Sequence, residues 1–214
     1  MATLLHIDSS LNGDNSVSRA VGVTFRAAWE QQHPDGTVIH RDLATDPIPH
    51  LDVVTNGAGF APEGDRTPEQ REAWARREKL IEEFETADAV LIGAPMYNWA
   101  IPSTLKAWLD HVILGGRTMG GDTVAGKPVT VIASRGGSYA PGTPNEGHDY
   151  IEPYLAWVLR DQLKTDLHCI VPELTLARSV PAMKDLIGLS DDSRDRAHED
   201  AKNRAKTLAT QLSA

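Results

Sequence analysis

The chain has 214 residues, a length that suits one well-buried core, and we expect a single domain over residues 1–214. The composition, 41% hydrophobic and 24% charged, is typical of a globular protein and excludes a disordered, fibrous or membrane-spanning one, because no apolar run approaches the roughly 20 residues of a membrane helix. The net charge of -9, without a basic patch, excludes nucleic acid as an expected partner.

Short apolar runs and longer segments with helical spacing alternate along the chain. The predicted strands are residues 4–7, 37–40, 89–93, 129–133 and 167–171. The predicted helices are residues 18–32, 68–86, 102–114, 148–160 and a charged, alanine-rich terminal helix at 190–214. Most strands are near-continuously apolar, which is typical of parallel strands covered on both faces.

This alternation predicts an α/β fold, a doubly wound five-stranded parallel sheet with helices on both faces. In such sheets ligands bind outside the carboxyl ends of the strands, so we expect function in the loops that follow the strands. Residues 46–67 are rich in Pro, Gly and Asn and lack periodicity. A loop of that length is usually functional or disordered, and we interpret it as a lid.

A hydroxyl-rich loop, residues 8–19, follows the first strand and leads directly into the first helix. Free backbone N–H groups and the positive end of the helix dipole suit a phosphate monoester there, with serine hydroxyls as further donors. An N-cap followed by a turn explains the same residues, so that alternative stays open. The Gly-Lys-Ser/Thr element of a P-loop and the GxGxxG dinucleotide fingerprint are both missing.

Two prolines, Pro95 and Pro102, bracket an aromatic loop after the third strand. The planar faces of Tyr97 and Trp99, together with backbone N–H groups, suit a flat heteroaromatic ligand. Packing of either ring onto the next helix is the alternative. The loop therefore predicts one wall of a site for a planar molecule.

Paired glycines, Gly136 and Gly137, follow the fourth strand, next to Ser134 and Arg135. They allow the backbone to approach a ligand or to adopt a positive φ, although an ordinary turn explains them equally well. Arg135 is either a solvated surface charge or a hydrogen-bond donor to a ligand carbonyl.

Other chemistries find little support in the sequence. The eight histidines show neither HExxH nor His-x3-His spacing, so no metal site is predicted, and the GxSxG elbow of a hydrolase is absent. Cys169 lies in an apolar run and is interpreted as a small core residue, with a reactive thiol as the alternative. The single cysteine and the lack of an evident export signal predict a cytoplasmic protein.

The three loops, their order and their placement resemble the family of FMN-dependent NADH:quinone oxidoreductases, also called azoreductases. The resemblance covers nearly the whole chain and is most specific at residues 94–99, 101–102, 105–110 and 134–137. It implies a flavodoxin-like fold, tightly bound FMN, NADH or NADPH as the transient donor, and a quinone or azo compound as a small planar aromatic acceptor. It also implies a homodimer with the site at the subunit interface and a ping-pong cycle that transfers two electrons.

Carried over by motif, the family's contacts place the phosphate at the first loop and the flavin ring at the other two loops. The implied cofactor contacts are Ser10, Ser16, Val17, Ser18, Met96, Tyr97, Asn98, Trp99, Ser134, Arg135, Gly136 and Gly137. The expected substrate contacts are Phe60, which would cover the flavin from the long loop, Trp99, Tyr139 and His148. The family usually has Phe where this chain has Trp99, so we expect a narrower or reshaped pocket. No side chain is expected to act as an obligatory acid or base.

Two other functions stay open at this point. One is a flavodoxin-like carrier that binds FMN and shuttles single electrons between proteins, for which the net charge of -9 could supply an acidic docking face. The other is a flavin-free relative with a regulatory or biosynthetic role. The long loop at residues 46–67 and the tryptophan-containing loop favour the enzyme.

Overall fold

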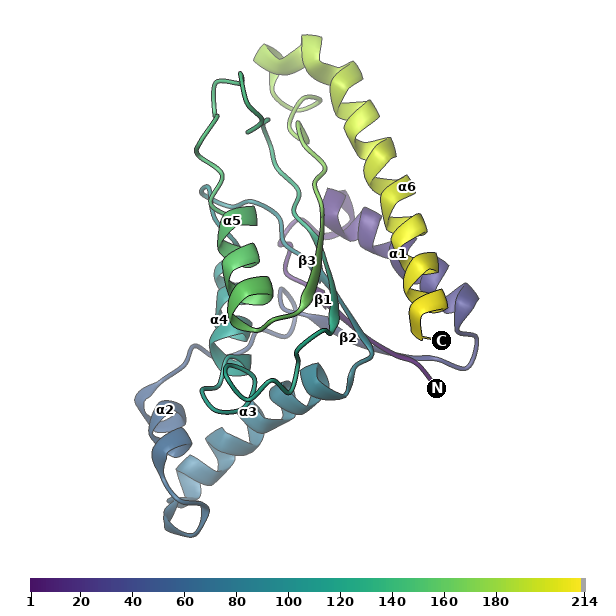
Figure 1. The fold of residues 1–214 in the computed structure, drawn as a ribbon. Helices are drawn as coiled ribbons and strands as arrows, with labels where there is room; N and C mark the ends of the chain where they lie inside the picture. The colour runs from purple at the N-terminus through teal and green to yellow at the C-terminus, as the bar shows by residue number, and fades with distance from the viewer. Residues whose placement is uncertain (213–214) are drawn as a thin grey trace.

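The computed structural model describes residues 1–212, and its centre is one parallel sheet. The strands are β1 (Thr3–Asp8), β2 (Thr37–Asp42), β3 (Ala89–Gly93), β4 (Pro128–Ile132) and β5 (Asp166–Ile170). They lie in the order β2-β1-β3-β4-β5, and every neighbouring pair is parallel (Figure 1). This is the strand order of flavodoxin-like sheets, so the predicted fold class and all five predicted strands are confirmed.

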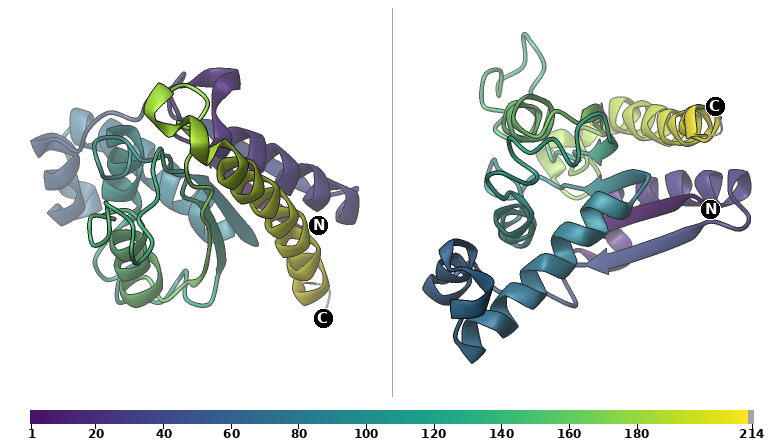
Figure 2. Two further views of the ribbon diagram at one scale, coloured as in Figure 1. Left: turned by 90° about the horizontal axis from the view of Figure 1, so that it is seen from above. Right: turned by 60° about the horizontal axis from the view of Figure 1, so that its bottom comes forward.

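Helices cover both faces of the sheet (Figure 2). On one face lie α1 (Val17–Gln32) and α6 (Ile187–Leu212), and on the other lie α3 (Pro68–Thr86), α4 (Ser103–Val112) and α5 (Glu152–Leu155). Each layer has its own hydrophobic core against the sheet. Alternate strand residues enter alternate cores, which explains why the central strands are apolar at every position.

The edge strands differ from the central ones. All residues of β3 are buried, whereas β2 and β5 are partly exposed along most of their length. The prediction that most strands are buried on both faces therefore holds for the centre of the sheet. At the edges one side of the strand has no neighbour to cover it.

Local signals start two of the long helices. The Ser16 side chain accepts a hydrogen bond from the Arg19 backbone N–H, which caps α1. Thr67 and Gln70 form a reciprocal capping box ahead of α3, with Pro68 in its first turn. These caps fix where each helix begins after its loop.

The prediction of an irregular loop at residues 46–67 is wrong in its middle, because α2 (Val53–Phe60) lies there. The Asp52 carboxylate accepts from the Thr55 N–H and starts this helix. Glycines lower its intrinsic helix propensity, yet they allow close packing on α3, where a Cβ on Gly59 would lie 3.4 Å from the Trp74 ring. Tertiary packing thus overrides the sequence pattern.

Two further boundaries differ from the predicted ones. The helix expected from residue 148 begins at Glu152, since the Asp149 carboxylate accepts from the backbone there, and it continues as a π-helix over Ala156–Gln162. The terminal helix begins at Ile187, and its predicted end at residues 213–214 lies outside the described residues. Along this helix the side chains of Ala197, Ala201, Ala205 and Leu208 are buried, while Leu212 is exposed.

Within residues 1–212, none of the helices combines the length and the apolar character that crossing a bilayer requires.

Candidate functional site

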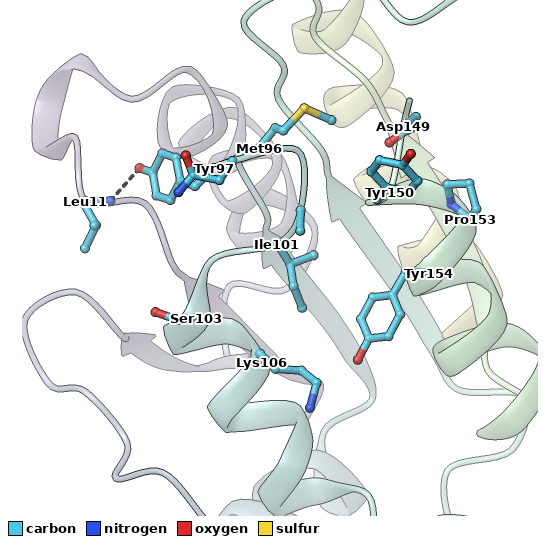
Figure 3. A pocket seen from close by; sticks show the side chains of 12 residues that line it. Leu11, Met96, Tyr97, Ile101, Ser103, Lys106, Asp149, Tyr150, Pro153 and Tyr154 are labelled. Atoms are coloured by element: carbon cyan, nitrogen blue, oxygen red, sulfur yellow. Dashed lines mark hydrogen bonds between the residues drawn. The ribbon is translucent and has the colours of Figure 1, made fainter. Parts of the chain in front are cut away.

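Two neighbouring cavities open at the carboxyl edge of the sheet, where the predicted loops converge. The first, about 860 Å³, is called the serine cavity, and the second, about 1020 Å³, is called the tyrosine cavity. The serine cavity is lined by Ser10, Leu11, Asn12, Asn15, Ser16, Val17, Pro95, Met96, Tyr97, Ser134, Gly136, Thr175, Leu176, Arg178 and Ser179. The tyrosine cavity is lined by Leu11, Met96, Tyr97, Asn98, Ala100, Ile101, Ser103, Lys106, Asp149, Tyr150, Pro153 and Tyr154 (Figure 3).

The hydroxyl-rich loop gives the serine cavity its donors. The Ser16 and Ser18 hydroxyls are buried and lie 3.1 Å apart at the start of α1. The first backbone N–H groups of a helix have no acceptor within the helix, so those of Val17 and Ser18 are available to a ligand. This arrangement suits an anion held by hydroxyl and amide donors.

The Arg19 guanidinium, in the first turn of α1, is engaged by other groups of the chain. Arg19 donates to both carboxylate oxygens of Asp42, at 2.9 and 2.6 Å, and to the Ser10 carbonyl oxygen. Hydrogen bonding to Asp42 raises the pKa of Arg19, although burial opposes the shift. Arg19 therefore holds the loop in place from behind, while the loop itself supplies the neutral donors.

The aromatic loop after β3 is a tight turn. Tyr97 and Ala100 pair through both of their backbone N–H and C=O groups, at 3.0 and 3.1 Å. The two residues between them, Asn98 and Trp99, have φ angles of 48° and 66°. Asn tolerates this left-handed conformation, but it is costly for a bulky residue such as Trp. Trp99 is 59% exposed at the tip of the turn.

Tyr97 joins this turn to the hydroxyl-rich loop. Its hydroxyl accepts from the Leu11 N–H at 2.9 Å and lies 3.2 Å from the Ser10 hydroxyl (Figure 3). The Met96 N–H donates to the Ser134 carbonyl oxygen at 2.8 Å, which joins the turn to the loop after β4. Tyr97 and Met96 thus line both cavities and form the wall between them.

The glycine loop is packed against the segment that follows β5. The Thr175 and Leu176 N–H groups donate to the carbonyl oxygens of Arg135 and Gly136. A Cβ on Gly136 would lie 2.6 Å from a Leu176 methyl group, so a larger residue would require the Leu176 side chain to move. The glycine allows the two loops to approach without that shift.

Arg135 is buried, at 5% exposure, so the alternative of a solvated surface charge is wrong. Its guanidinium lies 2.7 Å from Asp149, 3.1 Å from Glu152 and 3.7 Å from Glu173. These carboxylates come from two segments of the chain, the start of α5 and the segment after β5. Arg135 therefore fastens the glycine loop to the start of α5 and to the segment after β5.

The structure brings most of the predicted cofactor contacts together. Those that line the serine cavity are Ser10, Ser16, Val17, Met96, Tyr97, Ser134 and Gly136. Asn98 lines the tyrosine cavity, and Ser18 lies behind Ser16. The side chains of Trp99 and Arg135, and Gly137, line neither cavity.

The predicted substrate contacts lie outside both cavities. Phe60 is 84% exposed on α2, and Trp99 is at the tip of its turn. Tyr139 lies near the Arg135 guanidinium, and the His148 ring contacts Tyr150, which does line the tyrosine cavity. In this single chain none of these four side chains lines either cavity.

Two groups of cavity-lining residues were not among the contacts predicted from the sequence. Thr175, Leu176, Arg178 and Ser179 follow β5. The rule that ligands bind at the carboxyl ends of strands applies to this strand too, and it could have found them. Lys106, within the segment 105–110 that carries the family resemblance, and Tyr154 on α5 line the tyrosine cavity; their residue types did not mark them as contacts.

Across the tyrosine cavity, Tyr150 and Tyr154 face Ile101 and Lys106 (Figure 3). Burial raises the pKa of the Tyr154 hydroxyl, so this group stays neutral. Lys106 is paired with Asp110 on the next turn of α4. The cavity therefore offers flat apolar faces with a few polar groups at its margin, a lining that suits a planar aromatic molecule.

Comparison with known proteins gives the same fold. A protein-family model described as "Flavodoxin-like fold" matches residues 2–170. An FMN-dependent NADH:quinone oxidoreductase of Streptomyces avermitilis is 60% identical over the full length of both chains. A protein of the same name from Streptomyces coelicolor is 54% identical, over 100% of this chain and 98% of that one.

Solved structures agree with this result. A crystal structure of an FMN-dependent NADH-azoreductase from Bacillus anthracis, in complex with FMN, superposes with a TM-score of 0.80. The match covers 97% of this chain and 99% of that one, at 21% identity. At that identity the likeness shows the fold.

Proposed function

This chain belongs to the FMN-dependent NADH:quinone oxidoreductase family, and from that premise we propose that it binds FMN in the serine cavity and reduces planar acceptors beside it. The acceptors are quinones or azo compounds, and the electron donor is NADH or NADPH. The observation that carries this proposal is the pair of cavities that share one wall of Met96 and Tyr97.

The lining of the serine cavity fits FMN. The hydroxyls of Ser10 and Ser16 and the free amides at the start of α1 match the acceptor oxygens of a phosphate monoester. Pro95, Met96 and Gly136 supply the flat apolar surface and the close backbone approach that a heteroaromatic ring requires. Seven of the twelve predicted contacts, drawn from both the phosphate set and the ring set, line this one cavity, which supports the proposal.

When bound, FMN supplies the redox chemistry, taking a hydride from NAD(P)H and passing two electrons to the acceptor in a ping-pong cycle. The chain's residues bind and orient both partners. The tyrosine cavity holds the donor and then the acceptor, between Tyr150 and Tyr154 on one side and Ile101 on the other. No side chain is assigned a proton transfer.

The tyrosine cavity favours an enzyme over a single-electron carrier. A carrier passes electrons across a protein-protein contact and needs no room for a second small molecule. A cavity of about 1020 Å³ is large enough for the nicotinamide ring or a multi-ring acceptor. The full-length identity of 60% to a named quinone oxidoreductase supports the same choice.

We also propose that the enzyme is a homodimer in which a second copy completes the tyrosine cavity. Large apolar side chains in or next to its lining are exposed: Leu11 at 68%, Tyr150 at 54%, and Trp99, which follows the lining residue Asn98, at 59%. Grouped apolar exposure of this kind is typical of an interface. Light scattering of the purified protein at micromolar concentration should give twice the chain mass of 23.3 kDa.

We further propose that residues 1–214 form a single domain, that the protein is cytoplasmic and that it has no nucleic-acid partner. The free thiol of Cys169 suits a reducing compartment. The net charge of -9 opposes binding to a phosphate backbone.

The visible spectrum of the purified protein tests the proposal. We expect a yellow protein whose flavin band is bleached by NADH without oxygen and restored by added benzoquinone. A colourless protein that takes up no added FMN would refute the flavin site. Slow bleaching by NADH, with fast exchange of single electrons with a protein partner, would favour the carrier instead.

A further inference from the structure

A buried histidine-carboxylate cluster lies beside the hydroxyl-rich loop, outside both cavities. His6 and Asp8 belong to β1, and His40 belongs to β2, where it pairs in register with His6 (Figure 1). Residues two apart on a strand share a face, so His6 and Asp8 point to the same side, toward α1. The two strands together place two imidazoles and one carboxylate at one point.

The three potential ligand atoms are close enough for a single ion. The His40 Nε2 lies 3.0 Å from Asp8 Oδ2, and the His6 Nε2 lies 3.6 Å from the same oxygen. One ligand atom from each of the three residues can be chosen so that all lie within 4.8 Å of one another. Metal-nitrogen and metal-oxygen bonds of about 2.0–2.2 Å place ligands of a tetrahedral ion a little over 3 Å apart. Only small side-chain movements separate the observed arrangement from a coordinated one.

The His6 side chain is buried, and neither of its ring nitrogens makes a hydrogen bond to a group of residues 1–212. Asp8 Oδ1 is likewise buried without a hydrogen bond. A separation of 3.6 Å from Asp8 is too long for a good hydrogen bond. Buried polar atoms are normally satisfied, so an imidazole left unpaired beside a carboxylate points to a ligand.

The local charge also favours a cation. Arg19 is the only guanidinium of the described chain that is paired with Asp8, and it is bound on both arms by Asp42. Two carboxylates and one guanidinium leave one negative charge. His40, with its side chain 39% exposed, opens the cluster to solvent.

Helix α1 packs against the cluster and carries a glycine next to His6. Gly22 lies in the middle of α1, where glycine lowers helix stability. A Cβ at this position would lie 3.2 Å from the His6 Nε2, closer than an ordinary contact. The glycine keeps this nitrogen free of crowding by the helix.

We propose that His6, Asp8 and His40 form a binding site for one divalent transition-metal ion, with Zn²⁺ as the ion that fits best. Two imidazoles and one carboxylate are ligands that Zn²⁺ accepts, and water on the His40 side completes its four-coordinate shell. Since Asp8 directly precedes Ser9 and Ser10, the ion also fixes the start of the hydroxyl-rich loop. The site does not depend on flavin binding.

The test measures Zn²⁺ bound to the flavin-containing protein, by chelator treatment, equilibrium dialysis against free Zn²⁺ and elemental analysis. Wild type should bind one ion per chain at this site, and His40→Ala should weaken that binding at least about tenfold. Gly22→Ala should weaken it as well, because its methyl group crowds the His6 ligand atom. Neither substitution removes a core side chain, and circular dichroism verifies the fold.

His168→Ala is the matched control. His168 lies on β5, is 36% exposed at its side chain and contacts the Asp200 carboxylate at 3.1 Å, but it has no third ligand nearby in the described chain. This variant should bind Zn²⁺ as wild type does. Absence of a bound ion in wild type, or equal affinity in wild type and His40→Ala, would overturn the proposal.

Discussion

The serine and tyrosine cavities share a wall but differ in how the chain completes them. The serine cavity is built from buried polar groups, such as Ser16 and Ser134, that are held by loops hydrogen-bonded to one another. The tyrosine cavity is larger and ends in exposed rings such as Tyr150. The difference matches two tasks: permanent retention of a cofactor of defined shape, and transient binding of partners that vary.

The largest effect is expected from removing the buried hydroxyls of the serine cavity. Ser16→Ala with Ser18→Ala should weaken FMN binding at least about 100-fold, because a hydrogen bond to a charged group contributes about 1.5–3 kcal/mol. Fluorescence titration of the flavin-free protein with FMN measures the change. Ser103→Ala, which lines the tyrosine cavity alone, should leave the FMN affinity unchanged. Equal affinities for all three proteins would move the phosphate elsewhere.

The second substitution loosens the loops around the serine cavity. Arg135→Gln leaves Asp149 and its neighbouring carboxylates without their cation, and the free energy of unfolding should fall by about 2 kcal/mol. For a chain of this size the melting temperature then falls by about 4–8 °C. Arg160→Gln is the control, because Arg160 is exposed and pairs only with its neighbour Asp161. A melting temperature equal to wild type would show that Arg135 does not fasten these loops.

A third prediction concerns the left-handed backbone of Trp99 in the turn after β3. Trp99 has a φ of 66°, which costs a bulky residue about 1–2 kcal/mol, whereas glycine adopts this angle freely. Trp99→Gly should therefore raise the melting temperature by about 2–4 °C, after the higher chain entropy of glycine is offset. Trp99→Phe keeps the left-handed angle and should melt as wild type does. If both variants melt alike, the turn is not strained.

The smallest effect concerns Cys169, which lines neither cavity. Burial raises the pKa of the Cys169 thiol to about 11. The group is therefore protonated below that pH, and about a thousandth of it is thiolate at pH 8. Alkylation by iodoacetamide should be slow at pH 8, rise with pH, and become fast in guanidinium chloride. Fast labelling of the folded protein at pH 8 would support the reactive-thiol alternative.

The sequence predicted the sheet well because its strands are apolar at nearly every position. The serine, aromatic and glycine loops were predicted from their residue types, and their meeting point followed from the rule for parallel sheets. By contrast, α2 was missed, since Gly57 and Gly59 lower its helix propensity and only packing on α3 stabilises it.

Sequence patterns could not predict contacts between segments that lie far apart in the chain. Arg135 could not be identified as buried, because its carboxylate partners come from two segments that lie apart from it in the sequence. The His6 and His40 pairing depends on strand register, and a search for short metal motifs cannot find it. The lining residues of the tyrosine cavity come from α4 and from the entry to α5, which the fold alone brings together.

The central claim is that one cavity beside the flavin serves the donor and the acceptor in turn. Initial rates measured over a grid of NADH and benzoquinone concentrations test it most directly. A ping-pong cycle in one shared cavity gives parallel double-reciprocal lines, and benzoquinone at high concentration should compete with NADH. Intersecting lines without such competition would mean that both molecules bind at the same time, and would contradict a single shared cavity.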